Sequence, residues 1–97
     1  MALEDTPYDD VVYVVDLAVG RAAAGDTTGV LTLVDAALER LARMPYPGLL
    51  REARLAGTDA ADSARLGDFE RAAQSLWLFR HVVEDAARLE YQTLLTA

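Results

Sequence analysis

The only histidine of the chain, His81, is the residue whose type and neighbours most suggest chemistry. In a helix, Glu84 and Asp85 would follow three and four residues later on the same side, so the three side chains could hold a metal ion or form an acid–base pair. A tight zinc site needs about four ligands, however, and the histidine–glutamate motif of zinc proteases does not occur. We therefore interpret His81 as a solvent-facing residue paired with Glu84 or Asp85, and we predict no metal site.

The other residues that could support catalysis lack the context that catalysis requires. Asp9, Asp10 and Asp16 could suggest a cation site, but acids near the start of a helix are explained by the helix dipole. Ser63 and Ser75 have neither a nucleophile-elbow motif nor an obvious base. The six glycines are dispersed, so no phosphate-binding loop occurs, and the chain has no cysteine. We predict a non-enzymatic protein with no catalytic residue and no cofactor.

The net charge of −7, from 16 acids and nine bases, makes phosphate binding unfavourable, so we predict no nucleic-acid and no membrane partner. The longest apolar runs, Val11–Val15 and Leu76–Phe79, are far shorter than the ~20 residues that span a bilayer. The acidic N-terminus differs from a secretory signal, which begins with basic residues. All bases are arginine, and lysine, asparagine and isoleucine are absent, which is typical of a GC-rich bacterial genome. We expect a bacterial, cytoplasmic protein.

The elements that must position these residues are four helices in one domain over residues 1–97, approximately residues 7–24, 28–43, 47–66 and 68–95. Thr6 and Pro7 form a helix start, Gly25 and Gly67 are helix ends, and prolines at 45 and 47 interrupt the chain between the second and third helices. The Val11–Val15 run also has strand propensity, but no other segment offers a strand partner. We therefore predict an all-α fold of two antiparallel helical hairpins, arranged either as a bundle or as a repeat of hairpins.

Apolar residues spaced three and four apart predict the face that each helix buries. Small residues dominate this face in the third helix and allow a neighbouring helix to approach closely, although Gly57 could break or kink that helix. The expected core comprises Tyr8, Val12, Val15, Val19, Ala22, Val30, Leu31, Val34, Ala37, Leu38, Leu41, Leu50, Ala53, Gly57, Ala60, Ala64, Phe69, Ala72, Ala73, Leu76, Val83, Ala87 and Leu94.

Two similar turns indicate an internal repeat, because Gly25-Asp26 and Gly67-Asp68 are 42 residues apart and each joins two helical segments. The second unit, residues 64–76, resembles the central turn of a tetratricopeptide repeat, in which a glycine is followed by an aromatic residue, an alanine and a later apolar residue, here Gly67, Phe69, Ala72 and Leu76. In the first unit, residues 17–37, the matching residues are Leu17, Ala18, Gly25 and Ala37, whereas Thr27 and Val30 replace the aromatic residue and the alanine.

The chain also departs from that family, whose period is about 34 residues and whose first helix carries larger side chains than Ala56, Ala60 and Ser63. The resemblance implies a scaffold that holds a peptide or a partner protein on a helical face, without catalysis. Because about three units are usually needed for stability, two units imply self-association or a larger assembly.

One stripe of the fourth helix combines the residue types that dominate protein interfaces. Its members are Trp77, His81, Glu84, Arg88 and Tyr91, at steps of three and four, with Glu84 and Arg88 spaced for an ion pair. Trp77 lies between Leu76 and Leu78, so the helix is apolar almost all round at this point. Trp77 and Phe79 could be core residues, or the stripe could be a docking face.

We therefore predict a small non-enzymatic interaction module or adaptor that binds a protein partner or forms a homo-oligomer through its long last helix. An accessory subunit of an enzyme and a helical bundle that binds a small apolar ligand are the alternatives. A regulator that binds nucleic acid is disfavoured by the acidity of the chain.

Overall fold

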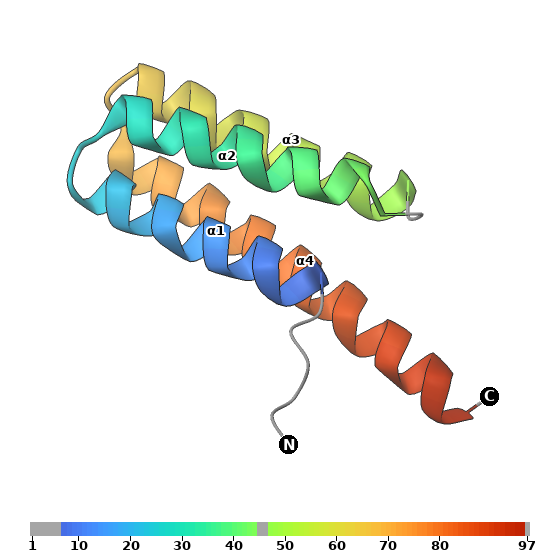
Figure 1. Cartoon of the computed structure of the whole chain (residues 1–97). Coiled ribbons are helices and arrows are strands. Elements are labelled where there is room, and N and C mark those ends of the chain that lie inside the picture. Colours follow the sequence, from blue (N-terminus) through green and yellow to red (C-terminus); the bar gives the residue numbers. More distant parts are fainter. Residues whose placement is uncertain (1–6, 45–46, 97) are drawn as a thin grey trace.

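The computed structural model describes residues 7–44 and 47–96, and it consists of four helices (Figure 1). They are α1 (Pro7–Ala23), α2 (Thr27–Ala42), α3 (Pro47–Arg65) and α4 (Phe69–Thr96). Each end lies within one residue of its predicted position, so the all-α prediction is confirmed. The helix α1 runs through Val11–Val15, which excludes the strand alternative there. The helix start predicted at Thr6 and the break predicted at Pro45 lie outside the described residues.

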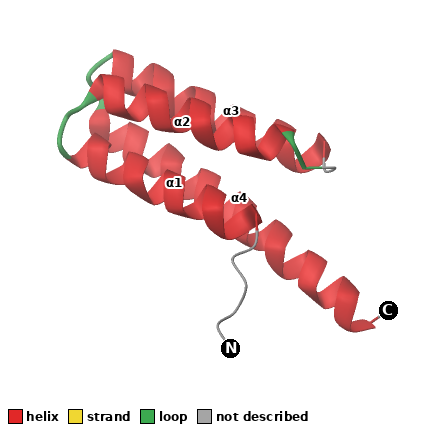
Figure 2. Cartoon of the chain, in the orientation of Figure 1, coloured by secondary structure: helices red, strands yellow, loops and turns green. Residues whose placement is uncertain are grey.

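Short connections make consecutive helices antiparallel, as Figure 2 shows. Each helix packs against the next one along the chain, and α4 returns to pack against α1. This order is that of an up-down-up-down bundle built from two hairpins. The helix α4 is the longest, with 28 residues, and its C-terminal end extends past the other three helices (Figure 1). The resemblance to tetratricopeptide repeats stays a prediction.

The two Gly-Asp turns have the same hydrogen-bonding pattern. Gly25 and Gly67 adopt φ values of 71° and 79°, in the left-handed region that favours glycine. At the first turn the amide of Asp26 donates to the carbonyl of Arg21, and at the second the amide of Asp68 donates to that of Ser63. These bonds close the ends of α1 and α3 as Schellman motifs. The prediction that these glycines end helices is confirmed. Asp26 then caps α2, where its side chain accepts from the amide of Gly29, and Asp68 accepts from the amide of Arg71 at the start of α4.

The two turns lie at the same end of the bundle and contact each other. The hydroxyl of Thr27 donates to the carbonyl of Ala64 at 3.1 Å, as a second hydrogen bond to a carbonyl that also accepts from the amide of Gly67. The ring of Phe69 lies beside Gly25. The repeat seen in the sequence therefore places two matching helix boundaries side by side.

The core agrees with most of the predicted stripes on α2 and α3 and differs more on α1 and α4. On α2, Leu31 lies outside the core and Leu38 is only partly buried, and on α3 Leu50 is only partly buried. On α1, Val11, Val14 and Ala18 are buried, whereas Val12 and Val19 are only partly buried. The five apolar residues from 11 to 15 cover both sides of α1. Packing against the neighbouring helices therefore decides which of these sides is buried. On α4, Phe79 joins the core, and the side chain of Leu94 lies outside the described residues.

The core is closely packed around Gly57, in the middle of α3. A β-carbon placed there would lie 3.1 Å from the ring of Phe79 and 3.2 Å from a methyl group of Val34. The helix runs unbroken from Pro47 to Arg65, so the break considered at this glycine is not present. Gly57 instead allows α3 to approach α2 and α4 at a distance that a larger residue would prevent.

We expect Gly57→Ala to lower the free energy of unfolding by about 1 kcal/mol, because overpacking a filled core costs more than the gain in helix propensity. Gly20→Ala is the matched control, since Gly20 is also inside a helix but has no neighbouring atom within 4 Å of the new β-carbon. That change should raise stability by about 0.5–1 kcal/mol. Urea unfolding of both variants measures the two effects, and a stabilising Gly57→Ala would contradict the packing argument.

Candidate functional site

The predicted docking residues lie on one exposed edge of α4. Trp77 is 46% exposed, whereas its near neighbour Phe79 is fully buried, so Phe79 is a core residue and Trp77 is not. His81, Glu84 and Arg88 are also exposed, and we call these three residues with Trp77 the Trp77 stripe. The side chain of Tyr91 lies outside the described residues.

Arg80 organises this edge and is absent from the prediction. Its guanidinium carbon lies 5.2 Å from the centre of the Trp77 ring, within the range of a cation–π interaction. The same guanidinium donates to Asp16 on α1 at 2.7 Å, and its Nε atom lies 3.5 Å from a carboxylate oxygen of Glu84. Arg80 therefore holds Trp77 beside α1. In the sequence, Arg80 lies three residues after Trp77 and four residues before Glu84, so these two contacts could have been predicted. The contact of Arg80 with Asp16 could not, because Asp16 is on a distant segment of the chain.

Two predicted pairings on the stripe are wrong, that of His81 with Glu84 or Asp85 and that of Glu84 with Arg88. Glu84 pairs with Arg80 rather than with Arg88, and Arg88 donates to Asp85 instead. Both acids expected beside His81 are therefore engaged by arginines. An arginine offers several donors in a fixed fork, so it competes well for these carboxylates. His81 itself is solvent-facing, as predicted.

A second polar group joins α3 to α4 on the other side of α4. The Ser75 hydroxyl donates to Asp59, and Arg71 donates to the same carboxylate at 3.0 Å. These hydrogen bonds, from Ser75 first and Arg71 second, hold the pKa of Asp59 below its usual value. The bond to Asp59 likewise raises the pKa of Arg71. No pattern in the sequence indicates this contact, because the two helices meet only in the folded bundle.

Apolar side chains surround that group on the surface. Leu55 is 70% exposed and Leu78 is 57% exposed, and both line a hollow of about 380 Å³ between α3 and α4. Val82 and Glu52 lie in the same hollow. The helix α4 thus presents two different edges, one with an aromatic and charged character and one that is mainly aliphatic.

Within residues 7–44 and 47–96, no three histidine, aspartate or glutamate side chains are close enough to hold a metal ion. Among the same residues, no helix is both long enough and apolar enough to cross a membrane. A comparison with known protein families, curated proteins and solved structures finds no match to this chain. The function must therefore be argued from the surface itself.

We expect the contribution of Asp59 to stability to be lost in acid. Because its folded pKa lies below the unfolded one, this contribution is present above about pH 4 and disappears as the pH falls through the folded value. The difference in unfolding free energy between the wild type and Ser75→Ala should accordingly be constant from about pH 7 to 5 and shrink below about pH 4. Urea unfolding at several pH values measures it. Asp62→Asn leaves this network intact and is the control; a Ser75→Ala difference that does not change with pH would contradict the assignment.

Proposed function

We propose that the protein is a small non-enzymatic interaction module that binds a basic protein partner through the Trp77 stripe of α4. The observation that carries this proposal is the half-exposed indole of Trp77, which Arg80 holds in place at the edge between α1 and α4. Exposure of the large apolar indole to water is unfavourable in free energy, and tryptophan is enriched among the residues that dominate the binding energy of protein interfaces. A side chain that is already ordered loses less conformational entropy when a partner covers it.

Charge supports a basic partner. The chain carries −7 overall, so a positively charged surface is attracted from a distance and a second copy of this chain is repelled. Close to Trp77, the carboxylates of Asp16 and Glu84 are each about half exposed and can accept further hydrogen bonds. The stripe therefore offers an apolar centre with acidic neighbours. Self-association through this stripe, expected from the sequence, is the competing use of the same residues.

The hollow between α3 and α4 is an open surface groove, which favours protein binding over an enclosed site for a small apolar ligand. The role of an accessory subunit of an enzyme is compatible with the same docking surface, since such a subunit also acts by binding a protein. We propose the adaptor because it requires only the docking surface described.

We expect Trp77→Ala to cost about 1–2 kcal/mol of stability, since only half of the indole is buried. Phe79→Ala is the matched control and should cost about 3–5 kcal/mol, because that ring is fully buried. Thermal unfolding followed by circular dichroism measures both changes. Equal losses would show that Trp77 is part of the core, which would remove the basis of the proposal.

Trp77 is the only tryptophan, so its fluorescence reports directly on binding. The probes are two synthetic amphipathic helical peptides, one of leucine and lysine and one of leucine and glutamate. We expect the lysine peptide to shift the Trp77 emission to shorter wavelength and the glutamate peptide to have no effect, and we expect Glu84→Arg to weaken the binding of the lysine peptide. Equal responses to both peptides, or no response to either, would overturn the proposal.

A further inference from the structure

The outer face of α3 carries an apolar centre with opposite charges on its two sides. It forms a shallow hollow of about 590 Å³ in which Leu55 lies between Arg51 and Arg54 toward the start of the helix and Asp59 and Asp62 toward its end. At 70% exposure, Leu55 is among the most exposed large apolar residues that the structure describes. An exposed apolar centre within a charged rim is the usual composition of a protein interface.

The arginines on this face form no ion pair with the side chains that the structure describes, at positions 8–44 and 48–89. Six of the nine arginines form ion pairs with described residues, and the other three are Arg21, Arg51 and Arg54. Two of these three therefore lie on the outer face of α3. In a chain with a net charge of −7, they make this face a place where a second acidic surface can approach without local repulsion.

The charge pattern is complementary to itself. Arg51 lies four residues before Leu55 and Asp59 lies four residues after it, which is about one helical turn in each direction. If two α3 helices pack antiparallel about a two-fold axis at Leu55, Arg51 of each copy faces Asp59 of the other, with Asp62 one turn further on. Each contact then occurs twice, as two-fold symmetry requires.

We propose that two copies of this protein associate through the outer faces of their α3 helices, with Leu55 at the centre. Leu55 of each copy lies against Leu55 of the other and against the aliphatic groove of Leu78 and Val82. A standard interface of about 800 Å² per partner would cover about an eighth of the 6239 Å² surface of one copy. In the proposed dimer, this interface area is formed by the outer face of α3 and the groove between α3 and α4.

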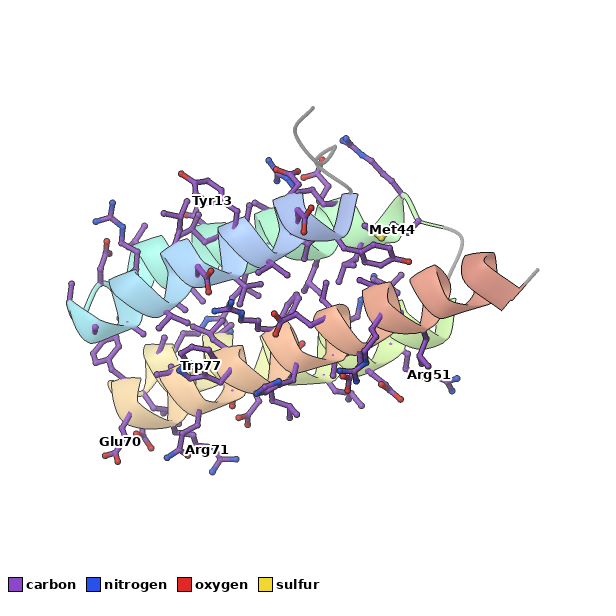
Figure 3. The ribbon with its side chains drawn as sticks, turned by 90° about the horizontal axis from the view of Figure 1, so that it is seen from below. Tyr13, Met44, Arg51, Glu70, Arg71 and Trp77 are labelled. Atoms are coloured by element: carbon purple, nitrogen blue, oxygen red, sulfur yellow. The ribbon has the colours of Figure 1, made fainter. Side chains whose placement is uncertain are left out.

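This inference does not depend on the Trp77 stripe. In the ring of helices α3 lies diagonally across from α1, and the stripe lies on the α1 side of α4. Figure 3 shows Arg51 and Arg71 projecting from one edge of the bundle and Tyr13 from the opposite edge. A dimer through α3 therefore leaves both Trp77 stripes exposed, and the assembly can bind two partners at once.

Sedimentation equilibrium of the wild-type chain at concentrations up to about 1 mM gives the first test. A reversible monomer–dimer equilibrium is expected, and a monomer at all concentrations overturns the proposal. Leu55→Ser should weaken the dimer about tenfold, since it removes the apolar centre. Tyr13→Ser is the matched control, because Tyr13 is 64% exposed on α1 and away from the interface. Trp77→Ala should also leave the dimer unchanged, and dissociation by that variant would instead place self-association on the Trp77 stripe.

Charge reversal tests the two-fold pairing directly. Arg51→Glu alone and Asp62→Arg alone should each weaken the dimer by about tenfold or more, because like charges then meet twice across the axis. An equal mixture of the two variants should form a heterodimer that is clearly tighter than the homodimer of either variant, although Asp59 still faces the introduced carboxylate once. In that heterodimer the carboxylate introduced at position 51 of one copy meets the guanidinium introduced at position 62 of the other, and the second pair keeps its original residues. Asp62 is used because Asp59 also joins α3 to α4. Single variants that dimerise normally, or a mixture that does not recover, would overturn this arrangement.

Discussion

The bundle depends on how closely α3 approaches its two neighbours. The buried face of α3 is made of glycine, alanine and one serine, Ser63, so backbone atoms, rather than large side chains, meet the Phe79 ring and Val34. Close-packed interiors tolerate little change in volume, and at Gly57 even one added methyl group would contact the Phe79 ring and Val34 closely. Because α3 contributes only small residues to the interior, the large apolar side chains of the core come from α1, α2 and α4. The leucine in the middle of α3, Leu55, is left on the outer surface.

Arginines connect the helices around this core. Arg40 pairs with Asp10 between α2 and α1, Arg71 pairs with Asp59 between α4 and α3, and Arg80 pairs with Asp16 between α4 and α1. Ion pairs exposed to water contribute little to stability, since screening and side-chain entropy oppose them. Their effect here is on position: Arg80 holds the indole of Trp77, and Arg71 with Ser75 fixes the Asp59 carboxylate. The two arginines of α3 that pair with no described residue give that face a charge unlike the chain as a whole.

The two edges of α4 differ in the surfaces they can accept. The edge beside α1 combines an ordered aromatic ring with carboxylates, which suits a basic partner. The edge beside α3 is aliphatic and adjoins a face that carries both signs of charge, which suits a second copy of the chain. Net charge separates these two uses, because it attracts basic partners and opposes self-association everywhere except where arginines compensate for it. One long helix therefore contributes to both proposed surfaces, the one for a basic partner and the one for a second copy of the chain.

The sequence by itself determined the four helices, their ends and the turns between them, because glycine, proline and capping residues act on the local backbone. It also determined that Gly25 and Gly67 end helices in the same way, and that His81 faces solvent. The tertiary structure alone decided which side of the Val11–Val15 run is buried, since that run is apolar on every side. It decided that Trp77 is exposed while Phe79 is buried, and it brought Arg80 to Asp16 and Ser75 to Asp59. Local rules specify where a helix begins and ends, but the direction it faces and the contacts it makes depend on segments distant in the chain that meet only in the folded bundle.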